Sequence, residues 1–146
     1  MALIWGLTCE ASVVENKALV QELRRLLDAG EFDAAGELLS EDVRWWVPRS
    51  SAELGFDRPV AGRDTVVRLT SGASERFYRP GSMTRQYHSF VAEGDLVAVW
   101  FTLRAITLQG DRYLNDYHEL FRCEDGLVSE VWEHLDTAYA MSKFSR

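Results

Sequence analysis

Residues 111–136, DRYLNDYHELFRCEDGLVSEVWEHLD, restrict the fold of this 146-residue chain more than any other segment. They predict two strands joined by the turn at residues 124–126, because Asp-Gly between strand-like runs is a strong hairpin signal. Polar residues stand at alternating positions of these otherwise apolar strands, and alternate residues of a strand share one face. The segment therefore predicts a sheet face that is largely apolar but carries several polar groups.

Two registers of this hairpin are compatible with the sequence. A three-residue loop with Gly126 in the left-handed conformation pairs Cys123 with Leu127, whereas a two-residue Asp-Gly turn sets His118 opposite Glu133. We favour the first register because it gathers the apolar residues on one face. On that face it places Asn115, Tyr117, Glu119, Phe121, Cys123, Leu127, Val131, Glu133 and Leu135.

Two carboxyl groups, those of Glu119 and Glu133, would then share an apolar face. This is costly unless the groups are hydrogen-bonded, protonated or functional. We expect burial to raise the pKa of Glu133, with repulsion from Glu119 added, so that the pair supplies an acid and a base near neutral pH. Asn115 and Tyr117 would orient a substrate or the carboxylate. The alternatives are a solvated strand glutamate and a buried structural one.

Composition excludes several classes of protein. The net charge of −7 argues against a nucleic-acid or anionic-membrane surface. No apolar run is long enough to span a bilayer, and the apolar start lacks the features of a signal peptide, so we expect cytoplasmic residence. The two cysteines, Cys9 and Cys123, have no CxxC spacing and predict neither a disulfide framework nor a zinc site.

Helical patterns come first in the chain and strand patterns later, which predicts an α+β fold with helices covering an antiparallel sheet. We expect one domain over residues 13–146, preceded by an N-terminal extension over residues 1–12. Ser12 is the expected N-cap of the first helix and Gly30 its end. The predicted helices are 13–29, 32–39, 64–77 and 137–143, and the predicted strands before the hairpin are 43–47, 83–91 and 96–106, with a loop over 49–62.

A tight turn at residues 92–95 would assign faces to the two strands that it joins. It predicts Arg85, Tyr87, Ser89, Ala98, Trp100, Thr102 and Arg104 on the inner face, and His88, Phe90, Val99, Phe101 and Leu103 on the outer face. Five tryptophans in so small a domain suit an aromatic-walled cavity, for which we take Trp46 and Trp100 as walls. The apolar outer face, Trp132 included, predicts a homodimer interface. The three histidines are scattered, which argues against a metal site.

Four segments carry a family likeness, in the order AGEFDAAGELLSEDVRWWVP, GRDTVVRL, AEGDLVAVW and NDYHELFRCEDGLVSEVWEHLD. In this order they resemble the nuclear transport factor 2-like superfamily over about residues 13–140. The most similar groups are the SnoaL-like polyketide cyclases, the ketosteroid isomerase relatives and the limonene epoxide hydrolases. The resemblance implies a conical α+β barrel, in which about three helices and a curved antiparallel sheet enclose one deep pocket. It also favours the first hairpin register.

The resemblance transfers few of the known catalytic residues. The isomerases' base falls at Val47 and their oxyanion tyrosine at Leu23, while their second oxyanion acid falls at Glu119. The epoxide hydrolases' Arg-x-Asp falls at Trp100 and Thr102. The acidic residue on the last strand, which both the epoxide hydrolases and the cyclases use, corresponds to Glu133.

Our leading hypothesis is a cofactor-independent enzyme that performs acid/base chemistry on an apolar small molecule, such as cyclisation, isomerisation, dehydration or epoxide opening. The alternatives are a protein that binds an apolar ligand without turnover, and a structural or assembly domain. We expect Glu133 and Glu119 to be catalytic, and no cofactor or metal. The expected substrate-binding residues are Asn115, Tyr117, Trp100, Trp46, Tyr87, Thr102, Arg104 and Val131.

Overall fold

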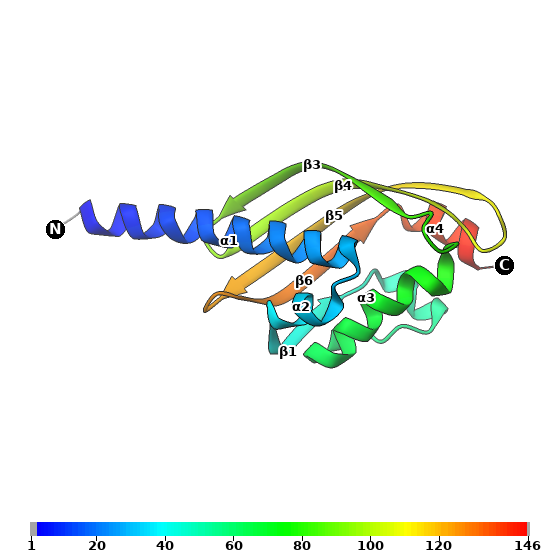
Figure 1. Ribbon diagram of the computed structural model, residues 1–146, viewed down its shortest axis with the longest axis horizontal. Coiled ribbons are helices and arrows are strands. Elements are labelled where there is room, and N and C mark those ends of the chain that lie inside the picture. Colours follow the sequence, from blue (N-terminus) through cyan, green and yellow to red (C-terminus); the bar gives the residue numbers. More distant parts are fainter. Residues whose placement is uncertain (1–2, 146) are drawn as a thin grey trace.

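The computed structural model describes the backbone of residues 3–145 and the side chains from Ser12 onward (Figure 1). The predicted helices and strands occur in the predicted order, and a 3₁₀ helix and a two-residue strand lie in the segment 49–62 that was predicted to be a loop. The elements are α1 (Leu3–Ala29), α2 (Phe32–Glu37), β1 (Leu39–Trp46), the 3₁₀ helix η1 (Arg49–Leu54), β2 (Val60–Ala61), α3 (Arg63–Phe77), β3 (Thr84–Glu93), β4 (Leu96–Ile106), β5 (Arg112–Glu124), β6 (Leu127–Leu135) and α4 (Thr137–Phe144). None of the helices in the described part is long and apolar enough to cross a membrane.

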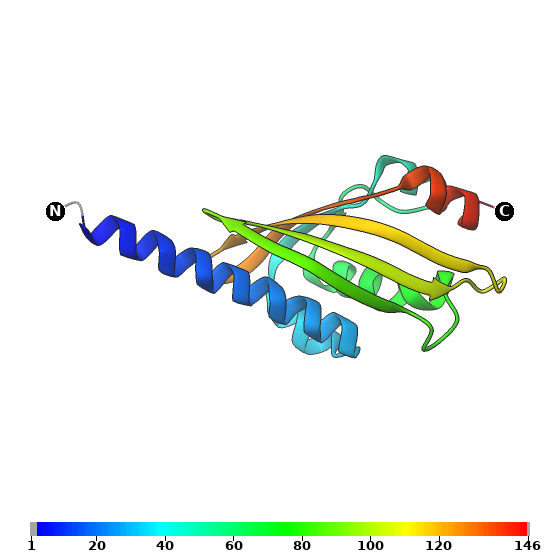
Figure 2. The ribbon, with the colours of Figure 1, turned by 90° about the horizontal axis from the view of Figure 1, so that it is seen from above.

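The six strands form one curved sheet in the order β2-β1-β6-β5-β4-β3. Neighbouring strands are antiparallel except β1 and β6, which are parallel. Within the described residues the edge strands β2 and β3 do not pair with each other, so the sheet curves without closing into a barrel. Helices α1 and α3 lie on the same side of this sheet. Helix α4 lies at the end of the sheet that is opposite to the start of α1 (Figures 1 and 2). The predicted α+β class is confirmed.

Helix α1 is longer than predicted. It begins at Leu3, so the expected N-cap at Ser12 is wrong. Its end is as predicted: Gly30 has a φ of 74°, a conformation that glycine adopts without steric cost. The Gly30 and Glu31 N–H groups bond the Leu27 and Leu26 carbonyls at 3.2 and 2.9 Å, which is the Schellman pattern of helix termination.

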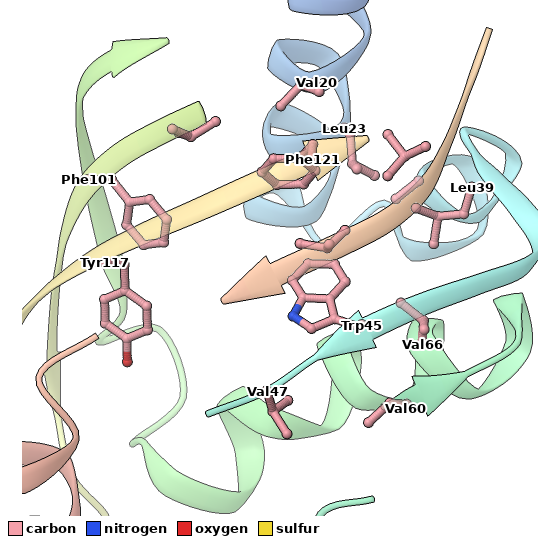
Figure 3. Packing of buried hydrophobic residues seen from close by; sticks show 14 of the residues in the cluster. Val20, Leu23, Leu39, Trp45, Val47, Val60, Val66, Phe101, Tyr117 and Phe121 are labelled. Carbon is pink, nitrogen blue, oxygen red and sulfur yellow. The ribbon is translucent and has the colours of Figure 1, made fainter. Parts of the chain in front are cut away.

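The apolar core lies between the concave face of the sheet and helices α1 and α3 (Figure 3). Val20 and Leu23 from α1 are fully buried against it. The Trp45 ring meets Phe121 edge-on, with ring centroids 6.3 Å apart. Close packing of this kind is what large core side chains contribute to stability.

The predicted faces of β3 and β4 are partly wrong. Arg85 and Tyr87 lie on the inner face as expected, but Tyr87 pairs with Phe101 and Ser89 with Trp100, so that His88 is an extra, bulged residue. A β-bulge places two residues opposite one and reverses the alternation beyond it. The inner face therefore carries Phe90, Val99, Phe101 and Leu103, and the outer face carries Ser89, Ala98, Trp100, Thr102 and Arg104.

The hairpin of β5 and β6 matches neither register in full. Its turn has two residues, Asp125 and Gly126, with φ angles of 52° and 77°, as a type I′ turn requires. Ser129 then forms a bulge, after which Phe121 pairs with Val131 and Glu119 with Glu133. The second register thus had the correct turn. The first had the correct inner face from Val131 onward, but Val128 rather than Leu127 lies on that face opposite Cys123.

Candidate active site

A cavity of about 180 Å³ opens between the concave face of the sheet, helices α1, α3 and α4, and η1. Its walls are mostly apolar, which favours an apolar ligand. Among the apolar wall residues are Leu27, Phe32, Trp45, Val47, Leu54, Phe56, Leu69, Phe77, Met83, Leu103, Leu135, Met141 and Phe144. The ionisable groups that line it are Arg24, Tyr78, Arg85, Tyr113, Tyr117, Glu119 and Glu133.

Glu119 and Glu133 stand directly opposite each other on β5 and β6. Directly opposed residues have Cβ atoms about 4.5–5.5 Å apart, so their carboxyl groups interact. Glu119 is only 3% exposed, whereas Glu133 keeps part of its surface accessible in the cavity wall. The pair therefore consists of one enclosed carboxyl and one that can reach a ligand.

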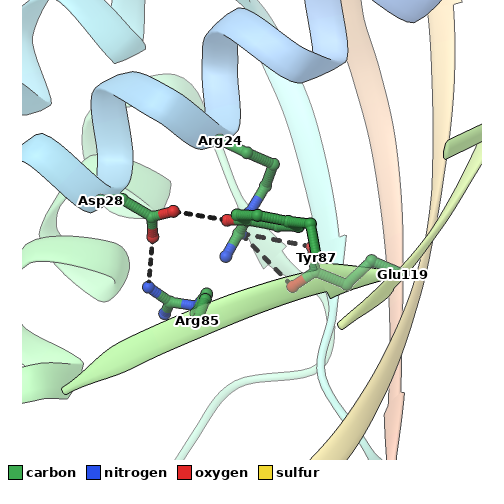
Figure 4. Close-up of polar contacts among 5 residues, drawn as sticks. All are labelled: Arg24, Asp28, Arg85, Tyr87 and Glu119. Atoms are coloured by element: carbon green, nitrogen blue, oxygen red, sulfur yellow. Dashed lines mark hydrogen bonds and ion pairs between the residues drawn. The ribbon is translucent and has the colours of Figure 1, made fainter. Parts of the chain in front are cut away.

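Arg24 is the charged partner of Glu119 (Figure 4). Its guanidinium Nη1 lies 3.2 Å from Glu119 Oε2 and 3.5 Å from Oε1, and its Nε donates to the Tyr87 hydroxyl at 3.1 Å. The guanidinium carbon also lies 5.0 Å from the centre of the Phe101 ring. Burial lowers the pKa of Arg24, but attraction by Glu119 and Tyr87 outweighs it and raises the pKa, so Arg24 stays charged.

Both carboxyl groups hold their protons more tightly than ordinary glutamates. Burial raises the pKa of Glu119 by more than Arg24 and Arg85 lower it. For Glu133, burial and then repulsion from Glu119 raise the pKa to about 7, against the lowering effects of Arg24, Arg85 and the Trp45 indole N–H. Glu133 can therefore exchange a proton near neutral pH.

Asp28 on α1 contacts Arg85 and Tyr87 on β3, and these contacts hold Arg24 in position beside Glu119 (Figure 4). Asp28 accepts hydrogen bonds of 2.6 Å from both Arg85 Nη1 and the Tyr87 hydroxyl. Burial, the first cause, raises the pKa of Tyr87 to about 12, so the phenol stays neutral. Tyr87 accepts from Arg24 while it donates to Asp28, and it thereby fixes the guanidinium.

Three tyrosines add further polar groups to the cavity lining. Tyr78, Tyr113 and Tyr117 all line the cavity, and the Tyr113 and Tyr117 hydroxyls lie 2.9 Å apart. Burial raises the pKa of each phenol. All three hydroxyls are therefore neutral groups that can donate or accept a hydrogen bond at neutral pH.

Several predicted binding residues lie near the cavity without lining it. Asn115 is buried and donates to the Tyr113 hydroxyl and the Asp136 carbonyl, both at 3.0 Å. It therefore connects Tyr113, in the cavity wall, to Asp136 at the start of α4. Val131 is fully buried in the core, and Tyr87 acts through Arg24.

Four other predicted binding residues lie on the outer face of the sheet. Trp46 donates to Glu130 at 2.7 Å, and Thr102 contacts His88 and Asp116. Trp100 is 41% exposed, and Arg104 donates to Gln86. The placement of Trp100, Thr102 and Arg104 follows from the bulge at His88. No group of three or more His, Cys, Asp or Glu side chains in the described part is arranged to hold a metal ion.

Sequence reasoning missed the central residue of the site, Arg24. Charged residues of an amphipathic helix are expected on its solvent-exposed side, yet Arg24 on α1 is 3% exposed. A signal was present: Arg24 follows the core residue Leu23 and precedes Asp28 by one helical turn, so it lies at the border of the apolar face. Trp45, Tyr78 and Tyr113 were missed as well.

Both the sequence and the fold of the chain are similar to known proteins. The model of the SnoaL-like domain matches residues 20–131. An NTF2-like protein of unknown function from Burkholderia pseudomallei has 20% identity and a TM-score of 0.81, covering 90% of this chain and 98% of its own. TerC, co-crystallised with polyporic acid, has 17% identity and a TM-score of 0.79, covering 90% and 99%.

A protein from Jannaschia sp. described as a SnoaL-like polyketide cyclase has 20% identity and a TM-score of 0.72, covering 90% of this chain and 92% of its own. At these identities the structures show a shared fold alone. No curated protein sequence matches the chain. The family match covers most of the chain, and this chain belongs to the SnoaL-like domain family, with the NTF2-like fold.

Proposed function

We propose that the protein is a cofactor-independent enzyme that acts on an apolar small molecule, with Glu133 as its general acid/base. One observation supports this above all: a carboxyl in the wall of an apolar cavity has its pKa raised to about 7 by burial and by Glu119. General acid/base catalysis is most efficient when the pKa lies near the working pH.

The ionised and the protonated forms of Glu133 are both populated near neutral pH. The ionised form removes a proton from a ligand in the cavity, and the protonated form returns one. Glu119 contributes through the pKa of Glu133, and Arg24 keeps Glu119 in place. The apolar walls exclude water, which strengthens these electrostatic effects.

The family includes cyclases and isomerases, and a structural neighbour was crystallised with polyporic acid. Both support a small-molecule substrate for this chain. The chemistry that fits is a proton transfer within cyclisation, isomerisation, dehydration or epoxide opening. The second candidate is a protein that binds an apolar ligand without turnover, which the largely apolar cavity walls favour.

A proton-abstraction probe tests the proposal without knowledge of the substrate. In 5-nitrobenzisoxazole, a base removes the ring C–H proton, the N–O bond breaks, and a coloured nitrophenolate with a nitrile group forms. We expect turnover that rises with pH through about 7. Glu133→Gln should abolish it while probe affinity stays within about tenfold, because shape and apolar contacts survive. The matched control is Glu124→Gln, an exposed residue near the turn.

The outcomes separate the two candidate functions. Turnover lost in Glu133→Gln alone supports the enzyme. Binding of the probe with no turnover above that of free carboxylate would favour the ligand-binding protein. Equal turnover in the wild type and Glu133→Gln would contradict the assignment of Glu133.

We also propose a homodimer, on different residues from those first expected. Val99 and Phe101 lie in the core and cannot form an interface. The outer face instead exposes Val91, Trp100 and Leu114, a set of large apolar side chains that supports association. Cytoplasmic residence stays a prediction.

A further inference from the structure

The cavity holds two buried arginine N–H groups that the described residues leave without a hydrogen-bond partner. They are Arg24 Nη2 and Arg85 Nε, on two side chains that both line the cavity. Arg24 uses its Nε on Tyr87 and its Nη1 on Glu119, and Arg85 uses Nη1 on Asp28. A buried charged donor without a hydrogen-bond partner is costly, so an acceptor atom of a bound ligand would stabilise both N–H groups.

The charges around these donors balance only when one proton is present. Arg24 and Arg85 carry two positive charges, and Asp28 and Glu119 carry two negative ones when ionised. Glu133 adds a further negative charge when it loses its proton. An anion that enters the cavity adds one more negative charge to this set, so each proton that the carboxyl pair keeps or takes up favours its binding.

We infer that the ligand is an apolar acid whose oxyanion, a carboxylate or an ionised enol, binds Arg24 and Arg85 while the Glu119–Glu133 pair carries the proton. The inference rests on the proposed function, because it specifies the ligand of the same cavity. Guanidinium groups suit such oxygens, since their hydrogen bonds to an anion are stronger than those to a neutral acceptor.

The size of the cavity limits the apolar part of the acid. An enclosed apolar cavity of about 150 Å³ binds benzene, and this cavity measures about 180 Å³ and is open to one side. One or two fused rings with a single acidic group therefore fit. The hydroxyls of Tyr78, Tyr113 and Tyr117 also line the cavity and can bind a further polar substituent.

Calorimetric titration of a matched pair of probes tests the inference. 2-Naphthoate and 2-naphthamide have the same shape and differ in charge. We expect the carboxylate to bind at least about tenfold more tightly at pH 6, as charge-assisted hydrogen bonds predict. Its affinity should fall by about tenfold for each pH unit just above about 7, with uptake of about one proton, because Glu133 must then be reprotonated.

Variants of the charged residues test which side chains cause the preference for naphthoate over naphthamide. Arg24→Gln should abolish the preference for the carboxylate, and the double variant Arg24→Gln/Glu119→Gln should do so without leaving an unpaired buried carboxylate. Arg122→Gln, on the outer face, is the control and should keep the preference. Glu133→Gln should keep it at pH 6 and lose its pH dependence.

Three results would overturn the inference: equal binding of the two probes to the wild type, a preference that persists in the folded double variant, or a carboxylate affinity that stays constant from pH 6 to 9.

4-Nitrophenol distinguishes the sources of the oxyanion. A lowered pKa of the bound phenol, read from its colour, supports an ionised enol, whereas tight binding of naphthoate alone supports a carboxylic acid. Loss of nitrobenzisoxazole turnover in Glu133→Gln is independent of all these results, so the proposed function and this inference can fail separately.

Discussion

Glu133→Gln should make the protein more stable at pH 8 but not at pH 4.5. The pKa of Glu133 is raised from 4.5 to about 7 in the folded state, so the ionised carboxyl is disfavoured by folding. Below pH 4.5 the carboxyl is protonated in both the folded and the unfolded state, and it imposes no penalty. As the pH rises to about 7 the unfolded state releases the proton first, and the folded state loses stability.

The size of the effect follows from the same two values. A change from 4.5 to about 7 corresponds to about 3 kcal/mol, and the partial exposure of Glu133 in the cavity reduces this to about 2–3 kcal/mol. Glutamine resembles the protonated acid in shape and carries no such penalty. The stability difference between variant and wild type should therefore grow by about 2–3 kcal/mol from pH 4.5 to 8 and then level off.

Urea unfolding followed by tryptophan fluorescence measures this difference at each pH. Glu124→Gln is the control, since an exposed carboxyl should show no comparable dependence. The reasoning is refuted if the difference between Glu133→Gln and wild type is independent of pH, or if it decreases as the pH rises. Such a result would mean that Glu133 titrates as an ordinary glutamate.

Three further changes test other parts of the structure. Glu119→Gln should lower the pKa of Glu133, because repulsion from Glu119 is its second-largest cause; the pH profile of nitrobenzisoxazole turnover should then move to lower pH with a smaller change in maximum rate. Phe101→Ala should cost about 3–5 kcal/mol in urea unfolding, because this core ring is 1% exposed and packs on Arg24. Trp100→Lys should leave stability nearly unchanged and convert a dimer to a monomer in sedimentation; a wild type that sediments as a monomer would contradict the homodimer proposal.

The sequence predicted the order of the elements and the pairing of β5 with β6, because these depend on local patterns. Periodicity located α3 to within one residue and β4 over its full length. It could not predict the bulges at His88 and Ser129, because the curvature of the assembled sheet decides where an extra residue is inserted. The faces of Trp100 and Thr102 were wrong for this reason.

Local sequence patterns also could not predict the surroundings of the buried charged residues. A helix pattern assigns Arg24 to a polar side, but its environment depends on Phe101, Tyr87 and Glu119, which come from distant strands. Glu133 was predicted because the alternation of β6 placed it beside apolar neighbours. Its raised pKa was also predicted, from burial first and then from repulsion by Glu119. The directly opposed pairing with Glu119 was not predicted, because it depends on the bulge at Ser129.

The two bulges together determine which charged side chains reach the cavity. With its two-residue turn and no bulge, β6 would set Glu133 opposite His118 on the outer face; the extra residue Ser129 returns it to the inner face, opposite Glu119. In β3 the extra residue His88 lets Arg85 share the inner face with Phe90. Bulges commonly re-aim side chains next to active sites. Here they bring Arg85 and Glu133 to one cavity: Glu133 is the general acid/base of the proposed function, and Arg85 is part of the proposed anion site.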